Sequence, residues 1–367
     1  MKKLNKDMII AGLLTGLSLG TLLIIVDNTY MTNKNLELVI IIGFIAYLIS
    51  SYLHTIIHEA GHLVFGLLSG YKFVSFRIGN IMLIKIKNKL KFKKFSLLGT
   101  AGQCLMEPPK LIDNKVPNAL YNLGGVLMNL IVSMITIILI IIFKNYPLVT
   151  CVLEIFALIG IYYAALNGIP LKLQINNDGM NTISLKKHPE SQKSFWIQLM
   201  MNAEQTKGKR MKDMPNDWFY FPTDEQMENS IETTIGTLYC NKLLDEHKFE
   251  ETKNSIIKLL KSKAEIIDIY KYLLTADRIY CELLDNNIEK ANKLLTEEQK
   301  KIMKSMKTLP SIIRTEYAIA KIIDKDTEKC SELLQYFEKI KEKYPYQGDI
   351  ESEEELINII KNKEKAE

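Results

Sequence analysis

The stretch YLISSYLHTIIHEAGHLVFGLLSG, from Tyr47 to Gly70, combines a long apolar run with three histidines and one glutamate. A run of this length and composition predicts a helix that crosses a bilayer or lies in a protein core. An unpaired polar group in either place costs kilocalories per mole, so it needs a partner or a function. The four polar residues are therefore expected to do something specific.

Three of them, His58, Glu59 and His62, form a His-Glu-x-x-His motif. Positions i and i+4 share one face of a helix, so both imidazoles can reach a single metal ion. Imidazole nitrogens suit zinc, which activates water, and Glu59 can accept a proton from that water. Solvated helix-surface residues are a poor alternative, because the flanking residues are apolar on both sides. The motif predicts one zinc ion per chain, with Glu59 as the general base.

A catalytic zinc site usually has three protein ligands and one open position, so a third ligand must come from elsewhere. Asp178 is the first candidate, because it follows Pro170, which ends a helix, and because an Asp-Gly pair can turn the chain back. A solvated turn aspartate would explain the same pair. Glu154, inside an apolar segment, and His54, one turn before His58, are the rivals. The residues alone leave this choice open.

Four apolar segments are each long enough to cross about 30 Å of hydrocarbon as a helix. They cover residues 8–26, 36–69, 118–143 and 148–166. No small-residue cleavage site follows the first segment, so we expect it to be a retained helix rather than a signal peptide. Residues 1–195 are predicted to form a membrane-embedded domain, and the more charged residues 196–367 a cytoplasmic helical domain.

Lysine and arginine concentrate in the N-terminal tip and in the loop of residues 71–117, whereas the two other loops hold one lysine each. This asymmetry predicts a multi-pass protein of the cell membrane with both termini in the cytoplasm. Five scattered cysteines without a CxxC pair indicate a reducing compartment. The abundance of Ile, Lys and Asn suggests a bacterial source. No basic patch interleaved with aromatic residues is present, so nucleic acid is not an expected partner.

The loop contains FVSFRIGNIMLIKIKNKLKFKKF, residues 73–95, in which apolar and basic residues alternate. This period of two predicts a small β-hairpin at the membrane surface, touching lipid headgroups or simply solvated. Residues 99–109, GTAGQCLMEPP, have two interpretations. They form either a re-entrant segment that brings Cys104 and Glu107 near a substrate, or a plain surface loop.

The C-terminal half contains three similar stretches in which Phe249, Ile288 and Thr327 take the same place. Their spacing is 39 residues, from 249 to 288 and from 288 to 327. Each stretch has the pattern of a helix, a short turn and a helix. This favours helical-hairpin repeats resembling tetratricopeptide repeats, while an ordinary helical bundle fits nearly as well. The fold class expected overall is an all-α polytopic membrane protein with a small hairpin, followed by an α-helical soluble domain.

The membrane half resembles the site-2 protease family of intramembrane zinc metalloproteases over roughly residues 47–180. The resemblance rests on HEAGHLVFGLLSGYKFVSFRIGN, on NLGGVLMNLIVS and on NGIPLKLQINNDG. It implies that His58, His62 and Asp178 are zinc ligands and that Glu59 is the base. It also implies that a second group of residues lies near the bound substrate, namely Gly124, Gly125, Asn129 and Asn167. The glycines have a simpler interpretation as sites of close helix packing.

The chain departs from the family pattern in three places. Val126 stands where the family usually has proline, Asn177 stands where leucine is common, and the gap between Pro170 and the Asp-Gly pair is longer than usual. The last two departures bear on where Asp178 is placed. The loop between the second and third helices is also too short for the peptide-binding domain that many relatives insert, so we expect the C-terminal half to recognise substrates or partners.

The function predicted first is an intramembrane zinc endopeptidase that hydrolyses membrane-spanning or membrane-associated peptides. The alternative is a non-catalytic membrane scaffold whose helical C-terminal domain binds partner proteins. Glu59 argues against the scaffold, because a structural zinc site needs no general base. A weaker third reading is a soluble zinc protease whose apolar helices form a core.

Overall fold

The computed structural model describes residues 6–87, 89–96, 100–172, 176–262, 264 and 266–363. The N-terminal lysines Lys2 and Lys3, which contributed to the predicted orientation, lie outside the described residues, as does Gly99. The chain divides into two compact units. The membrane unit comprises residues 1–79 and 100–192, and the helical unit comprises residues 80–99 and 193–367. The predicted fold class is confirmed: long apolar helices and a small sheet are followed by a helical region.

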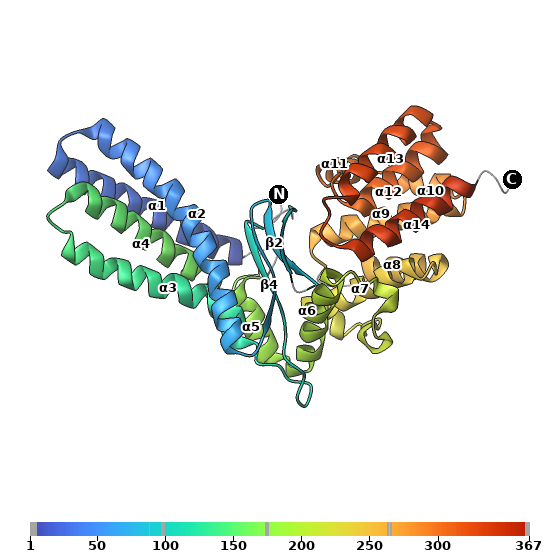
Figure 1. The fold of residues 1–367 in the computed structure, drawn as a ribbon, viewed down its shortest axis with the longest axis horizontal. Coiled ribbons are helices and arrows are strands. Elements are labelled where there is room, and N and C mark those ends of the chain that lie inside the picture. The colour runs from blue at the N-terminus through green and yellow to red at the C-terminus, as the bar shows by residue number, and fades with distance from the viewer. Residues whose placement is uncertain are drawn as a thin grey trace. The chain divides into compact units, whose positions relative to one another are not determined.

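Four long helices dominate the membrane unit, and all four predicted segments are confirmed as helices. They are α1 (Lys6–Asn33), α2 (Leu36–Leu68), α3 (Ala119–Ile142) and α4 (Pro147–Gly168), drawn in blue and green in Figure 1. Each is long and apolar enough to cross a membrane. Large apolar side chains such as Leu13, Leu23 and Ile141 are exposed on their outer faces. These faces suit contact with lipid, because apolar tails solvate them and water does not.

Helices α2 and α3 approach each other closely through two glycines. A Cβ atom on Gly61 would lie 2.2 Å from the carbonyl oxygen of Gly124, and one on Gly124 would lie 2.6 Å from that of Gly61. Any larger residue at either position would push the helices apart. Small residues commonly allow such backbone contact between membrane helices. The approach sets the motif-bearing face of α2 directly against α3.

The strands form two antiparallel pairs, one in each unit. They are β1 (Lys72–Ile78), β2 (Ile81–Ile86), β3 (Lys89–Lys94) and β4 (Gly102–Glu107). In the membrane unit β1 pairs antiparallel with β4, and in the helical unit β2 pairs antiparallel with β3. The alternating pattern thus correctly indicated strands. Residues 102–107 form a strand paired with β1, so the plain loop interpretation was wrong for them, while the re-entrant interpretation of the segment stays a prediction.

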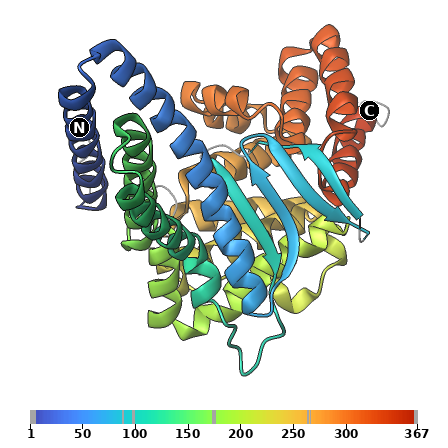
Figure 2. The same cartoon turned by 60° about the vertical axis from the view of Figure 1, so that its left-hand side comes forward.

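The membrane unit ends with a short helix, α5 (Asp178–Lys187), and a single 3-10 turn, η1 (Pro189–Ser191). Helix α5 packs against α3 and α4. Figure 2 shows the four long helices from a second side. Because α5 begins at Asp178, the position of its first turn decides where that carboxylate lies.

The helical unit is built mainly from helix pairs, as the three similar stretches predicted. The pairs are α7 (Ser230–Asp245) with α8 (Phe249–Lys261), α9 (Asp268–Leu284) with α10 (Ile288–Leu294), and α12 (Pro310–Ile319), extended by the π-helical turn η5 (Ala320–Asp324), with α13 (Thr327–Lys341). The remaining α-helices are α6 (Gln192–Thr206), α11 (Glu297–Ser305) and α14 (Gln347–Asn362). Short 3-10 turns η2 (Met211–Asp213), η3 (Asn216–Trp218) and η4 (Gln226–Glu228) join α6 to α7.

The turn inside each pair repeats as well. His247, Asn286 and Lys325 have φ angles of 59°, 58° and 51°, and each lies two residues before the second helix of its pair. A left-handed backbone conformation, which non-glycine residues rarely adopt, therefore recurs every 39 residues. The same turn geometry at the same interval supports the helical-hairpin interpretation over an irregular bundle.

Candidate metal centre

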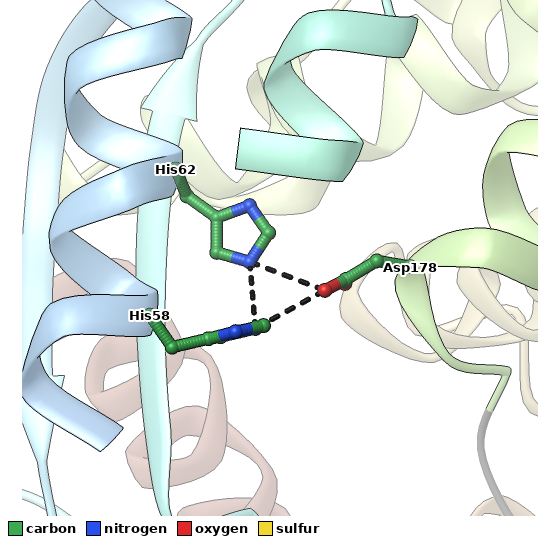
Figure 3. Close-up of side chains that lie close together, drawn as sticks. All are labelled: His58, His62 and Asp178. Carbon is green, nitrogen blue, oxygen red and sulfur yellow. Dashed lines mark hydrogen bonds and ion pairs between the residues drawn. The ribbon is translucent and has the colours of Figure 1, made fainter. Parts of the chain in front are cut away.

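Three side chains converge between α2 and α5. His58 and His62 project from one face of α2, and Asp178 reaches them from the first turn of α5 (Figure 3). The two Nε2 atoms lie 3.2 Å apart. Asp178 Oδ2 lies 3.1 Å from His58 Nε2 and 3.5 Å from His62 Nε2. In the described part of the chain, this is the one group of histidine, cysteine and acidic side chains close enough to hold a metal ion.

The orientation of the His62 ring follows from a backbone contact. Its Nδ1 atom lies 2.8 Å from the carbonyl oxygen of Tyr121 in α3. A carbonyl oxygen only accepts, so Nδ1 carries the proton and donates it. The lone pair of the ring is then on Nε2, which faces His58 and Asp178. Metal-ligating histidines commonly donate their other ring nitrogen in this way.

The His58 ring fits because a glycine leaves room for it. A Cβ atom on Gly125 in α3 would lie 2.4 Å from His58 Cε1 and 2.6 Å from both ring nitrogens. His58 Nδ1 lies 3.3 Å from the amide Nδ2 of Asn129, one helical turn further along α3. Gly125 and Asn129 therefore contact the cluster from the same helix.

Asp178 is positioned by its neighbours in the sequence. Asn177 caps α5 by accepting a hydrogen bond from Met180 N at 2.9 Å, and its Nδ2 donates to the carbonyl oxygens of Leu166 at 2.7 Å and Ile169 at 2.6 Å. A Cβ atom on Gly179 would lie 2.2 Å from the Gly168 carbonyl oxygen.

Asn177 thus ties the end of α4 to the start of α5. It is one of the three places at which the chain departs from the family pattern, and here the departing residue caps the turn that carries Asp178.

The donor set fits a divalent metal. The Asp178 carboxylate oxygen Oδ2 adjoins the Nε2 atoms of both imidazoles. Three acceptor atoms this close repel one another unless a proton or a metal cation lies between them. Two imidazoles and one carboxylate are a ligand set that zinc prefers.

Glu59 is buried beside the cluster and faces strand β4. A Cβ atom on Gly102, the first residue of β4, would lie 2.6 Å from Glu59 Oε1, so a side chain there would displace the Glu59 carboxylate. The buried Arg77 of β1 donates to the carbonyl oxygens of Gly79 at 2.7 Å and Gly102 at 3.4 Å. Arg77 thereby holds the backbone against which the Glu59 carboxylate rests. Neither residue was predicted from the sequence; the available signal was an arginine between the apolar residues Phe76 and Ile78.

The other candidates lie outside the three-residue cluster. Both ring nitrogens of His54 have protein partners, and Glu154 is not in the group. Asn167 donates to the carbonyl oxygen of Tyr163 at 2.9 Å, within α4. Four residues were predicted to lie near the substrate: Gly124, Gly125, Asn129 and Asn167. Their contacts described here are with other residues of the chain, and their contact with substrate stays a prediction.

Comparison with known proteins identifies the family. The sequence model of peptidase family M50 matches residues 44–348, which is most of the chain. No curated protein and no solved structure matches the chain significantly. The chain therefore belongs to peptidase family M50, the site-2 protease family, and the resemblance found in the sequence is confirmed. The match continues beyond the 47–180 region into the helical unit.

Proposed function

We propose that this member of family M50 is an active intramembrane zinc endopeptidase. The observation that carries the proposal is the convergence of His58, His62 and Asp178 on one point, with Glu59 adjacent. His58, His62 and Asp178 would hold one zinc ion. A zinc ion in such a site supplies Lewis acidity that activates water and polarises a peptide carbonyl.

Glu59 would perform the proton transfers. It follows His58 directly, and its buried carboxylate lies close enough to interact electrostatically with His58, His62 and Asp178. It accepts a proton from the attacking water and passes that proton to the nitrogen of the departing amine. The peptide bond breaks, a water molecule is consumed, and a carboxylic acid and an amine are released. Arg77 and Gly102 keep the backbone beside Glu59 in place during these transfers.

The substrate would lie along strand β4. Within the described residues β4 is an edge strand of the sheet, and its first residue touches Glu59. An extended peptide can pair with such an edge through main-chain hydrogen bonds, which presents a carbonyl group without requiring a particular sequence. We propose membrane-spanning or membrane-associated peptides as substrates, because the four candidate spans place the site among apolar helices.

The helical unit would supply recognition. Paired helices often form extended binding surfaces, and this chain lacks room for an inserted peptide-binding domain. We propose that the unit binds a substrate segment or a regulatory protein on the cytoplasmic side of a bacterial cell membrane, where both termini would lie. Truncation of residues 200–367 is expected to change which peptides are cleaved, and unchanged selectivity would reject this role.

The first test is the zinc content of detergent-purified protein. Wild type is expected to contain about one zinc per chain, with less in His58→Ala and in Asp178→Ala, because each removes one of three ligands. Zinc lost in His58→Ala but retained in Asp178→Ala would reject Asp178 as a ligand. Zinc-free wild type would reject the enzyme proposal and leave the scaffold.

The second test concerns the base. Glu59→Gln keeps the shape of the side chain but cannot accept a proton. We expect it to retain zinc and to cleave a membrane-associated peptide about 100 to 10,000 times more slowly, which is the usual size of a general-base effect. Cleavage by Glu59→Gln at the wild-type rate, or no cleavage by either protein across a peptide panel, would favour the scaffold.

A further inference from the structure

His54 is buried among three membrane helices with both ring nitrogens engaged. It lies on α2 one turn before His58 and is 0% exposed. Its Nε2 atom lies 2.9 Å from the carbonyl oxygen of Phe156 in α4. A Cβ atom on Gly160 of α4 would lie 2.4 Å from His54 Cε1, so a glycine makes room for the ring. A buried imidazole costs more than an apolar side chain of similar size, which calls for a role beyond packing.

The partners of the ring determine its tautomer. A carbonyl oxygen only accepts, so His54 Nε2 must carry a proton and donate it to Phe156. The neutral ring then has its lone pair on Nδ1, which lies 3.0 Å from one end of the Asn129 amide. The group that faces this lone pair must be a donor, which is the amide nitrogen of Asn129.

The structure draws the Asn129 oxygen toward His54 and the nitrogen toward His58. The two ends of an amide have the same shape, so their assignment follows from the hydrogen-bonding partners. When the amide nitrogen points toward His54, the amide oxygen takes the position that lies 3.3 Å from His58 Nδ1. That oxygen accepts a proton from Nδ1, which leaves the His58 lone pair on Nε2.

The opposite orientation fails at both ends. The Asn129 oxygen would then face the lone pair on Nδ1 of the neutral His54 ring, so two acceptor atoms would lie against each other. The nitrogen would donate to His58 Nδ1 and force the proton of that ring onto Nε2, the atom that faces Asp178 and His62. A protonated Nε2 cannot bind a metal ion. Only one orientation gives each facing ring nitrogen a complementary partner and still frees the ligand atom.

We propose that His54 and Asn129 are positioning residues that hold His58 in its metal-binding tautomer. This inference rests on the proposed zinc site. The Phe156 carbonyl fixes the tautomer of His54, and His54 fixes the orientation of the Asn129 amide. The amide oxygen in turn keeps the His58 proton on Nδ1. His62 needs no such relay, because it donates directly to the Tyr121 backbone. A side-chain substitution can therefore remove the hydrogen-bonding partner of His58, whereas the partner of His62 is a backbone carbonyl that remains in any variant.

The test is zinc affinity, measured by competition with a chelator on the full-length protein in detergent. Loss of an outer partner of a metal-ligating histidine typically weakens metal binding about 10- to 100-fold. We expect a loss of that size in Asn129→Leu and about a tenfold loss in His54→Phe. Because both residues act through one relay, the double variant should bind zinc no more weakly than Asn129→Leu.

Thr136→Val is the matched control. Thr136 is buried on the same helix, about two turns from Asn129, and its hydroxyl donates to the Val132 carbonyl oxygen within α3. It should bind zinc as wild type does. Circular dichroism of each variant checks that the helices are retained.

A spectroscopic readout separates positioning from packing. The chain has five histidines. Ring-¹⁵N labelling of zinc-loaded protein, with His188→Asn and His247→Asn for assignment, should show His54 protonated on Nε2 and His58 on Nδ1.

Wild-type affinity in Asn129→Leu, independent and multiplicative losses in the double variant, or an Nδ1-protonated His54 would each overturn the relay while leaving the enzyme proposal intact. Zinc-free wild type would instead reject the enzyme proposal, and the relay with it.

Discussion

The two units of the molecule distribute polar and apolar residues in opposite ways. In the membrane unit the long helices carry exposed leucine, isoleucine and phenylalanine, and the buried side chains of α2 and α3 include His54, His58, Glu59 and Asn129. In the helical unit the apolar residues are inside, in a core that includes Ile279, Tyr280, Leu283, Ile313 and Tyr317. Charged residues cover the outer faces of its helices.

This inversion follows from the solvent. Water favours burial of apolar surface, which stabilises the helical unit. Lipid tails are as apolar as leucine, so membrane helices associate through close packing and polar contacts instead. Glycines and hydrogen-bonded side chains are therefore the structural contacts of the membrane unit. Because the same contacts position the metal cluster, structure and chemistry are harder to separate there than in the helical unit.

The largest effect is expected from Arg314, an exception inside the helical core. Its guanidinium is fully buried, with Nη2 2.6 Å from Asp277 and Nε 2.8 Å from Glu353. Arg314→Met leaves both carboxylates without their cation and should cost about 3–5 kcal/mol of unfolding free energy. Both tryptophans, Trp196 and Trp218, lie in the helical unit, so their fluorescence follows its thermal unfolding within the whole chain.

The control is Lys300→Met, which removes a surface pair with Glu297. It should change the unfolding free energy by about 0.5 kcal/mol or less. A loss below about 1 kcal/mol in Arg314→Met would mean that the buried charges contribute little. Zinc content should stay the same in both variants, because the metal cluster is in the other unit.

The second effect concerns packing in the membrane unit. Gly125→Ala places a methyl group within 2.4 Å of the His58 ring, which must move. A displacement of about 1 Å at a reacting centre can cost about 100-fold in rate. We expect a loss of that order in peptide cleavage, together with weaker zinc binding and an unchanged tryptophan transition. Gly20→Ala is the control, since nothing lies within 4 Å of its Cβ position. Equal activity in the two variants would contradict the packing argument.

The third effect is a pH dependence of the helical unit. Burial raises the pKa of Asp349 to about 7. The folded state therefore holds a proton that the unfolded state, with a pKa of about 3.9, has lost, and stability falls as the pH rises from about 4 to 7. Asp349→Asn removes this titration and keeps an acceptor for Gln205, which now donates to Asp349 at 3.1 Å.

The full shift corresponds to about 4 kcal/mol, but the Asp349 side chain is only partly buried, so solvent reduces the effect. The variant should be about 1–2 kcal/mol more stable than wild type at pH 8 and nearly equal to it at pH 4. Tryptophan-monitored melting at several pH values measures this. Asp324→Asn, at an exposed position, is the control. A variant less stable than wild type at pH 8 would show that the carboxylate is needed in its charged form.

The smallest effect tests the repeated turns. Lys325 has a φ of 51°, a conformation that costs a non-glycine residue about 1 kcal/mol. Lys325→Gly should therefore raise the unfolding free energy by about 0.5 kcal/mol, after the entropy of the unfolded chain is counted. Asn286→Gly should gain less, because asparagine tolerates this conformation better. Destabilisation by both substitutions would mean that the side chains contribute more than the backbone strain removes.

The sequence predicted the helices of the membrane unit closely, because each is a long apolar run that depends on its own residues. The sequence also predicted that His58, Glu59 and His62 lie close together, because their spacing along one helix is enough to place them there. Strand β4 was missed, because its pairing with β1 is a contact between distant segments. The association of residues 80–99 with the helical unit was missed for the same reason: Met82 and Ile84 pack against Tyr346.

Local periodicity therefore determined the spans, the strand pattern, the 39-residue repeat and the motif face of α2. The tertiary structure decided which polar groups meet. Asp178 lies beside the histidines because Asn177 and Gly179 lock a turn onto the end of α4, and Asn129 lies between two imidazoles because glycines let three helices approach closely. These contacts depend on the relative positions of whole helices, and no spacing along the chain encodes them.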